Sequence, residues 1–250
     1  MEYPRTSTDD PSALRGAAPC VPDDVRLYAI GDIHGRLDLL TELLDRIYRD
    51  RAGHDASHHK IIFLGDYIDR GGDARALLDF ISTGQIDGFE TIYLVGNHED
   101  YLLRFLDDTA IGPNWLKYGG AVTLTSYGIT PDAENFHRVQ KELRLAVPEN
   151  HLAFLRGLKT WHIEGSYLFV HAGIRPGVPI ARQTRHDLTF SREGFVDCAH
   201  DHGHVVVHGH TVCAAPELLP NRINIDTGAF SSGTLTCLVL QGASRAILQT

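Results

Sequence analysis

The stretch LYAIGDIHGR, residues 27–36, places Asp32 and His34 directly after a short apolar run and between two glycines. The apolar run, residues 25–30, has the length and composition of a buried strand. The segment RLDLLTELLDRIYRD, residues 36–50, then carries Leu37, Leu40, Leu43, Leu44 and Ile47 on one helical stripe. The sequence therefore predicts a strand, a polar turn and a helix in that order.

The same unit recurs twice downstream. The segment IIFLGDYIDRG begins at Ile61 and TIYLVGNHE begins at Thr91, so strands are predicted over residues 61–64 and 91–95. Each is followed by a helical pattern, ARALLDFI in the first case and EDYLLRFL in the second. Strands that alternate with helices indicate parallel pairing and right-handed crossovers.

The remaining chain divides into three parts. Residues 1–24 are rich in Pro, Ser, Thr and Asp and are expected to form a mobile tail. The pattern is irregular around WLKYGGAVTLTSYG and then helical over residues 133–145 and 148–158, which we interpret as an inserted cap over about 108–160. The strand-rich second half, with YLFVHAG, HVVVHGHT, RINIDTGA and LTCLVLQG, predicts a second sheet packed on the first within one domain over 25–250.

Composition narrows the classes of function. With 250 residues, of which 43% are hydrophobic and 22% charged, the chain is long enough to bury one large core. A formal net charge of -9 argues against nucleic acid and anionic membranes as partners. The four cysteines are scattered without a Cys-x-x-Cys pair, which excludes a zinc ribbon and fits a reducing, cytoplasmic location. No apolar run reaches the roughly 18 residues that a membrane span needs. Oligomeric state is left open.

Polar residues cluster where the predicted strands end. Ligands of open α/β sheets gather at the carboxyl ends of the strands, so we expect these side chains to share one site. Imidazole and carboxylate groups suit Mn²⁺, Fe²⁺ and Zn²⁺, and one carboxylate shared by two ions would hold a pair. The strand-end residues are Asp32, His34, Asp66, Asn97, His98, His171, His208 and His210.

The ordered motifs GDIHG, GDYIDRG, GNHE, HAG and GHT resemble the PPP-type phosphoprotein phosphatases, especially the bacterial and phage members, within the calcineurin-like metallophosphoesterases. The resemblance runs from about Leu27 to Leu240. It implies a four-layer α/β/β/α sandwich and two divalent metal ions, for which manganese is expected and iron or zinc are alternatives. It also implies hydrolysis of phosphoserine, phosphothreonine or phosphotyrosine in a protein or peptide partner, by in-line attack of a metal-bridging hydroxide.

The resemblance also assigns roles to individual residues. His98 would protonate the leaving group, with Asp69 orienting its ring. Arg70 would fork onto two phosphate oxygens, and Arg192 is the candidate for a second phosphate arginine. The sequence departs from the pattern at Phe190, where related bacterial enzymes usually carry Trp. For the metals, Asp32 and His34 would hold the first ion, Asp66 would bridge, and Asn97, His171 and His210 would complete the second.

Two other functions are weighed against the phosphoprotein phosphatase. The symmetrical diadenosine tetraphosphate hydrolases share these motifs, and Trp115, Lys117 and Tyr118 in the cap could form a shelf for adenine. A noncatalytic scaffold of the same fold is disfavoured because the motif residues are intact. A nuclease or cyclic-nucleotide diesterase would usually show Gly-His-x-His, whereas Val212 occupies the last position here.

Several polar residues receive a structural interpretation. We expect His208 to pack or support the site, and we expect the HDHGH segment, residues 200–204, to be a solvated loop. His58 and His59 are interpreted in the same way as that loop. Glu99 is expected to support its turn or cap the following helix and not to take part in chemistry.

Overall fold

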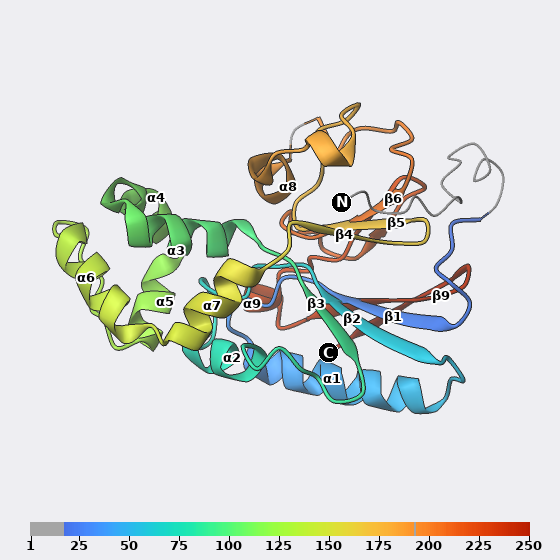
Figure 1. Cartoon of the computed structure of the whole chain (residues 1–250), viewed down its shortest axis with the longest axis horizontal. Helices are drawn as coiled ribbons and strands as arrows, with labels where there is room; N and C mark the ends of the chain where they lie inside the picture. Colours follow the sequence, from blue (N-terminus) through green and yellow to red (C-terminus); the bar gives the residue numbers. More distant parts are fainter. Residues whose placement is uncertain (1–17, 193) are drawn as a thin grey trace, which may run out of the picture.

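The computed structural model describes residues 18–192 and 194–250, and it contains two five-stranded sheets (Figure 1). The first sheet has the strand order β10-β9-β1-β2-β3, and the second has the order β4-β5-β6-β8-β7. Both sheets are mixed, and helices cover their outer faces. The predicted α/β class and layered sandwich are therefore confirmed.

In the first sheet, β1, β2 and β3 run parallel, whereas β9 is antiparallel to both β1 and β10. In the second sheet, β5, β6 and β8 run parallel, and β4 and β7 pair antiparallel at its edges. The first sheet comprises β1 Val25–Ile30, β2 His58–Phe63, β3 Glu90–Tyr93, β9 Thr236–Gln241 and β10 Ser244–Gln249. The second comprises β4 Trp161–Glu164, β5 Tyr167–Val170, β6 Val205–His208, β7 Glu217–Leu218 and β8 Arg222–Asn224.

Three apolar clusters separate the layers. Alternate residues of β1 point to opposite faces, so Leu27 lies between the sheets and Tyr28 lies toward the first helical layer. From the second sheet, Phe169 enters the cluster between the sheets, whereas Leu168 packs beneath α8 with Leu188. This alternation is what makes both faces of each sheet apolar and builds the four layers.

The helices complete the layers. Helix α1 (Leu37–Ala52) and helix α2 (Ala74–Ile81) lie along the outer face of the first sheet (Figure 1). Both helices were predicted. Of the residues expected on the buried stripe of α1, Leu40, Leu43, Leu44 and Ile47 are buried, and Leu39 is buried in place of Leu37. The remaining helices are α3 Asn97–Asp107, α4 Gly112–Lys117, α5 Gly120–Ser126, α6 Phe136–Ala146, α7 Glu149–Gly157, α8 Arg185–Phe190 and α9 Ala229–Ser232, with 3₁₀ turns at Thr109–Ile111 and Ile180–Arg182.

The structure differs from the sequence-based expectation in two places. His58 and His59 were expected in a loop, but they pair with Val25 and Arg26 as the first residues of β2. The irregular segment around residues 115–128 forms α4 and α5, which meet at a glycine with φ of 108°. Burial of Trp115 in the main apolar cluster offsets the weak helix propensity of this glycine-rich and β-branched segment.

The sequence predicts an N-terminal tail and no membrane span. Of the predicted tail over 1–24, residues 1–17 lie outside the described residues. Val21 is buried, and its N–H donates to the Gly242 carbonyl oxygen at 3.0 Å. Within the described residues, no helix has the length and the apolar composition needed to cross a membrane.

Candidate metal centre

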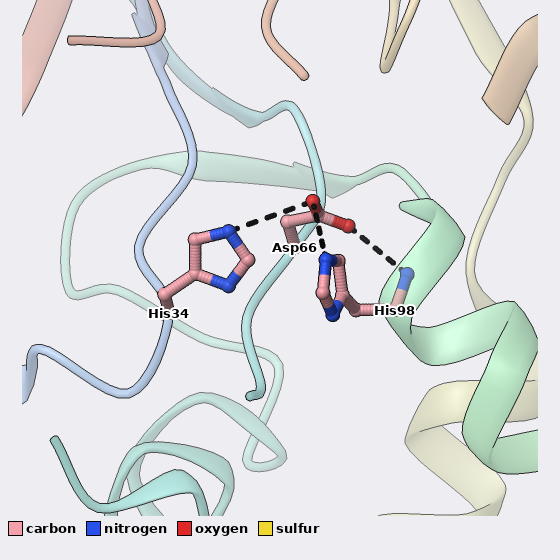
Figure 2. A group of neighbouring side chains, drawn as sticks. All are labelled: His34, Asp66 and His98. Carbon is pink, nitrogen blue, oxygen red and sulfur yellow. Dashed lines mark hydrogen bonds and ion pairs between the residues drawn. The ribbon is translucent and has the colours of Figure 1, made fainter. Parts of the chain in front are cut away.

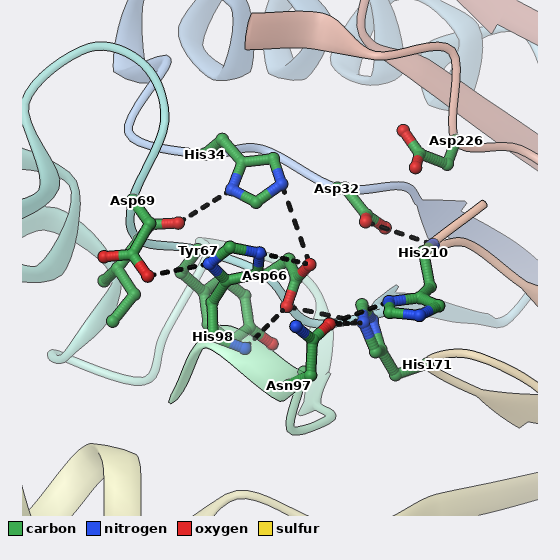
Figure 3. A network of polar contacts seen from close by, with 12 residues as sticks. Asp32, His34, Asp66, Tyr67, Asp69, Asn97, His98, His171, His210 and Asp226 are labelled. Carbon is green, nitrogen blue, oxygen red and sulfur yellow. Dashed lines mark hydrogen bonds and ion pairs between the residues drawn. The ribbon is translucent and has the colours of Figure 1, made fainter. Parts of the chain in front are cut away.

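The polar residues predicted at the strand ends, with the exception of His208, converge on one buried site (Figure 3). Asp32 and His34 follow β1, and Asp66 follows β2. Because both sheets present the carboxyl ends of their parallel strands at this edge, residues from the two halves of the chain meet here. The other members are Asp69 after β2, Asn97 and His98 in the first turn of α3, His171 after β5 and His210 after β6.

The backbone is strained at this site. Among the described residues, the non-glycine residues with positive φ are those at or beside the site, with φ between 48° and 69°. Such conformations cost about 1 kcal/mol or more each and persist where the surrounding structure holds them. Strain of this kind clusters at functional sites, and here it turns side chains inward. The residues are His34, Asp66, Asp69, Arg70 and His210.

Glycines allow the loops to approach one another. A Cβ added to Gly96 would lie 2.1 Å from Asp66 Oδ1, and one added to Gly209 would lie 2.1 Å from Asp32 Oδ1. No side chain fits at either position without moving a site carboxylate. The two glycines therefore belong to the construction of the site.

Glu99 holds the loop after β2 in place. Its Oε2 accepts hydrogen bonds from the backbone N–H groups of Asp66 and Gly96, both at 2.9 Å. Its Oε1 accepts from the N–H groups of Tyr67 at 2.8 Å and Ile68 at 3.3 Å. Burial, together with the nearby Asp66 carboxylate, raises the pKa of Glu99 to about 7. The structure confirms that Glu99 supports the turn.

Asp66 lies at the centre, with imidazoles on both sides of its carboxylate. Figure 2 shows His34 and His98 on one side, with their Nε2 atoms 3.6 Å and 3.7 Å from Asp66 Oδ2. On the other side, His171 Nε2 lies 3.4 Å from Asp66 Oδ1. Burial acts to raise the pKa of Asp66, but His171, His98 and the other imidazoles outweigh it and hold the pKa below its usual value.

The tautomer of His34 leaves a lone pair facing this carboxylate. Nδ1 of His34 lies 2.7 Å from the Ile68 carbonyl oxygen, which can only accept, so Nδ1 carries the proton. Nε2 is then unprotonated and points at Asp66 Oδ2, and it has no hydrogen-bond partner among the described residues. Burial lowers the pKa of His34 to about 3, so the ring stays neutral. A buried lone pair that faces a carboxylate oxygen fits a cation between them.

His171 repeats this arrangement on the opposite side. Its Nδ1 donates to the Leu64 carbonyl oxygen at 3.0 Å, which leaves Nε2 as an acceptor. That nitrogen lies 3.0 Å from Asn97 Oδ1 and 3.4 Å from Asp66 Oδ1, so three acceptor atoms face one another. A cation that all three could ligate would remove the repulsion between them.

The described residues thus contain two groups able to hold a metal ion, and Asp66 belongs to both. Within each group the potential ligand atoms lie within 4.8 Å of one another, and every member is buried. The donor set of imidazole and carboxylate suits first-row divalent metals. The groups are His34, Asp66 and His98 on one side and Asp66, His171 and His210 on the other.

Asp32 lies beside the second group and has an unexpected acidic neighbour. Its Oδ2 accepts from the His210 N–H at 3.1 Å, and its Oδ1 is buried without a partner in the described chain. Burial raises the pKa of Asp32 well above its usual value, and the carboxylates of Asp226 and Asp66 add to this effect. Asp226 was missed from the sequence, although INIDTG repeats the pattern of an apolar strand followed by an acid.

His98 and Asp69 form the hydrogen-bonded pair that the sequence suggested. His98 Nδ1 lies 2.7 Å from Asp69 Oδ2. Burial acts to lower the pKa of His98, but the carboxylates of Asp66 and Asp69 outweigh it and raise the pKa above its usual value. Asp69 also accepts from Trp115 Nε1 at 2.9 Å and from the Thr123 hydroxyl. Trp115 and Thr123 come from α4 and α5, so no local motif announces their part in the site.

The two predicted arginines lie at the edge of the site. The Arg70 guanidinium lies 5.1 Å from the centre of the Phe230 ring. Arg192 Nε donates to His210 Nε2 at 2.8 Å. Because Nε2 accepts this bond, His210 carries its proton on Nδ1, which donates to Asn97 Oδ1 at 2.7 Å.

The other histidines singled out in the sequence lie away from the centre. The His208 ring packs 5.1 Å from the Phe195 ring, and burial lowers the pKa of His208 to about 3. The segment 200–204 precedes β6. These positions fit the structural interpretation of both features.

The comparisons with known proteins define the class. The calcineurin-like phosphoesterase family matches residues 25–214, which is most of the chain, and the chain belongs to this family. It is therefore a phosphoester-hydrolysing enzyme of a metal-dependent class. A crystal structure of a candidate diadenosine tetraphosphatase superposes with a TM-score of 0.60 at 18% identity, covering 93% of this chain and 98% of that one, which shows the shared fold.

Curated relatives give more detail. The asymmetrical bis(5'-nucleosyl)-tetraphosphatase PrpE of Bacillus thuringiensis is 28% identical over 229 residues, covering 84% of this chain and 88% of the relative. A symmetrical bis(5'-nucleosyl)-tetraphosphatase of Aromatoleum aromaticum is 30% identical over 151 residues, covering 60% of this chain and 45% of the relative.

These relatives overturn part of the sequence-based prediction. The prediction of a phosphatase acting on phosphoserine, phosphothreonine or phosphotyrosine in a protein partner is wrong, because the relatives are named for dinucleotide hydrolysis. The superfamily was identified correctly, but its phosphoprotein phosphatase branch is not confirmed. The physical reason is that the strand-end motifs were assigned to metal and phosphate binding, which the hydrolysis of either substrate would require.

Proposed function

We propose that the chain hydrolyses dinucleoside polyphosphates at a phosphoanhydride bond, using two divalent cations held at the strand ends. The observation that carries the reaction type is Asp66, whose two oxygens face separate groups of imidazoles. The substrate class is supported by the tetraphosphatase relatives, which match 84% of the chain in the case of PrpE.

Asp66 separates the two proposed sets of ligands. Asp32 is placed in the first set with His34, as the family resemblance implies, although its Oδ2 accepts from the N–H of His210 in the second set. Asparagine adds an oxygen ligand without a further negative charge, which suits a site already rich in carboxylates. When bound, the cations polarise phosphate oxygens and lower the pKa of a water molecule so that it can attack phosphorus. We propose manganese as the metal because the family resemblance implies it; the imidazole and carboxylate donors by themselves are also compatible with iron and zinc. Asp32 and His34 hold the first ion, Asp66 bridges, and Asn97, His171 and His210 hold the second.

His210 couples this site to Arg192. For Nδ1 of His210 to ligate a cation, the neutral ring must carry its proton on Nε2. Nε2 then cannot accept the hydrogen bond from Arg192 that is present in the structure. Nε of Arg192 is then free to donate to a phosphate oxygen, together with Arg70, while Nη2 can keep its bond to the His210 carbonyl oxygen at 3.2 Å.

The chain's own residues then handle the leaving group. His98 Nε2 is buried without a partner in the described residues, while Asp69 holds its Nδ1. The protonated ring donates from Nε2 to the oxygen that leaves phosphorus, and Asp69 stabilises the charged ring. Because a nucleotide leaves with a phosphate oxygen of low basicity, it needs this proton less than an alkoxide does.

The charge of the chain is compatible with an anionic substrate only when divalent cations occupy the site. The chain has a formal net charge of -9, and the buried carboxylates of Asp32, Asp66, Asp69 and Asp226 add local negative charge. Two divalent cations and the two arginines reverse the sign locally. We therefore expect weak polyphosphate binding after chelation.

The test is hydrolysis of diadenosine tetraphosphate by the purified protein, chelated and then reloaded with manganese. Two ADP molecules would indicate symmetrical cleavage, and ATP with AMP would indicate asymmetrical cleavage. A phosphoserine peptide serves as the competing substrate. We expect at least a 10²-fold preference in kcat/KM for the dinucleotide, worth about 2.7 kcal/mol of transition-state stabilisation. Failure to cleave the dinucleotide, when an aryl phosphate is turned over at the same loading, contradicts the proposal.

A further inference from the structure

The aromatic shelf suggested by the sequence is built differently in the structure. Trp115 has no exposed surface and donates to Asp69, so it cannot contact a ligand. Tyr118, at the end of α4, has 41% of its surface exposed. An aromatic contact site in this region must therefore be built around Tyr118.

Tyr118 belongs to a row of aromatic rings that runs from the end of α4 across α3 to α8. Its ring lies 5.5 Å from that of Tyr101, with 25° between the ring planes. The Tyr101 ring meets the Phe190 ring edge to face at 5.5 Å, and the His186 ring stacks on the Phe190 ring at 4.7 Å. We call Tyr118, Tyr101, Phe190 and His186 the aromatic row.

Two members of the aromatic row, Tyr118 and Phe190, are close in the chain to a residue proposed to act on phosphate or to its hydrogen-bond partner. Tyr118 precedes Gly119, whose carbonyl oxygen accepts from the Arg70 N–H at 3.4 Å. Phe190 lies two residues before Arg192.

Tyr101, in the middle of the aromatic row, lies on the same helix as the site residue His98. Tyr101 lies three residues after His98 on α3, so the two side chains are neighbours on the helix surface. A planar group lying on the row would place the atoms attached to it beside the metal centre.

We propose that the aromatic row binds a nucleoside base of the substrate, an inference that rests on the proposed function. Stacking on an aromatic ring accepts any base because every base has a π-face. Lys117 lies beside Tyr118, with Nζ 5.8 Å from its ring centre, and supplies positive charge near the polyphosphate. Arg175 lines a hollow of about 260 Å³ together with His186 and Phe190.

A second hollow near the site is the main competitor for the base. It has a volume of about 420 Å³ and lies between the loop after Arg70 and helix α5, lined by residues that include Gly72 and Val122. No aromatic ring is among its lining residues, and Asp73 adds a carboxylate that would repel a polyphosphate. The aromatic row is the better site for a nucleotide on both counts.

The test compares two substrates in the manganese-loaded full chain. Diadenosine tetraphosphate carries bases, whereas 4-nitrophenyl phosphate carries none and reports damage to the metal centre. For Tyr118→Ala and Phe190→Ala, we expect the ratio of kcat/KM for the dinucleotide to kcat/KM for the aryl phosphate to fall about 5- to 150-fold, the range for losing one stacked base. Tyr118→Phe should keep most of the ratio, because the ring remains.

The control is the substitution of a half-exposed tyrosine outside the aromatic row. Tyr48→Ala removes a tyrosine with 37% exposure on the second half of α1, which lies toward the opposite end of the parallel strands, and it should leave the ratio unchanged. An unchanged ratio in both row variants overturns the inference, as does a selective loss of dinucleotide turnover in Val122→Trp without one in the row variants. Hydrolysis of the aryl phosphate but not of the dinucleotide by the unaltered chain overturns the proposed function instead.

Discussion

The strand-end loops and the helical insertion contribute to the same site in different ways. The loops at residues 31–35, 65–71 and 209–211 come after β1, β2 and β6, and they contain the non-glycine residues with positive φ among the described residues, whereas residues 96–99 open helix α3 after β3. The insertion, residues 112–157, is made of α4 to α7 and reaches the site through Trp115 and Thr123. The contrast indicates that the residues proposed to bind metal and phosphate lie in short motifs, whereas the residues that support them, and those proposed to contact a base, are brought together by tertiary packing.

The strand-end loops and the helical insertion also differ in the interactions that stabilise them. The loops bring several carboxylates and strained residues together, and buried Glu99 fixes one of them through backbone N–H groups. The insertion buries Trp115, Leu124 and Leu143 in the apolar cluster shared with α1 and α2. Metal binding should therefore matter most for the loops, and packing should matter most for the insertion.

The largest effect is expected at the residue that both metal groups share. Asp66→Asn keeps the shape of the side chain but removes the negative charge that faces both groups. Each metal contributes several kcal/mol of transition-state stabilisation, so kcat/KM should fall by at least about 10³-fold. Metal analysis of the dialysed protein should show fewer than two equivalents, with Asp45→Asn on exposed α1 as the control. Two retained metals with near-normal turnover would mean that Asp66 does not bridge.

The next effect concerns the leaving group. His98→Asn removes the proposed proton donor, so hydrolysis of an alkyl phosphate should slow by roughly 10²- to 10⁴-fold. The loss should be smaller for diadenosine tetraphosphate and smallest for 4-nitrophenyl phosphate, because those leaving groups need less protonation. Rates on the three substrates, measured at equal metal content, test this order. Equal losses on all three would argue against a proton-donor role.

The sequence predicted the first region well and the second poorly, for a physical reason. An apolar strand followed by a polar residue, either directly or after a glycine, is a local pattern, and it located Asp32, Asp66 and His171 without knowledge of the fold. Trp115 is invisible to such reasoning because its contact with Asp69 spans 46 residues. Asp226 lies between these cases, since its strand-end pattern was present but belonged to none of the recognised motifs.

The start of β2 and the substrate class were both predicted wrongly, for related reasons. His58 was expected in a loop because its polarity hides the pairing with Val25 that extends β2. The substrate was assigned wrongly because the motifs describe only the atoms around phosphorus. The rings that we propose to contact a base come from three separate helices, α3, α4 and α8, and their proximity requires the folded chain.

A smaller effect should show whether the insertion reaches the chemistry. Trp115→Phe keeps the packing but removes the donor to Asp69 Oδ2, which lies 2.9 Å away. Loss of an outer hydrogen bond of this kind typically costs about 10- to 100-fold in activity. We expect this loss for alkyl phosphate, with metal content unchanged and with Trp161→Phe on β4 as the control.

A double-mutant cycle separates positioning from general destabilisation. If Trp115 acts through Asp69 and His98, Trp115→Phe should add little further loss in a His98→Asn background. Full additivity would indicate that Trp115 contributes only to the packing of the insertion.

The smallest effect concerns metal affinity and tests whether the strand-end loops set it alone. Arg192→Met removes the hydrogen bond that His210 Nε2 accepts, and this bond keeps the His210 proton on Nδ1, the atom proposed to ligate the second cation. Losing one hydrogen bond that competes with metal binding, worth about 0.5 to 1.5 kcal/mol, should raise manganese affinity at that site by about 2- to 12-fold. Turnover should nevertheless fall, because the phosphate loses a guanidinium contact. Calorimetric titration of manganese into chelated protein, with Arg182→Met as the control, measures the affinity. A weaker affinity in Arg192→Met would mean that Arg192 supports the bound state of His210 and does not oppose it, and the proposed release of Arg192 Nε on metal binding would have to be abandoned.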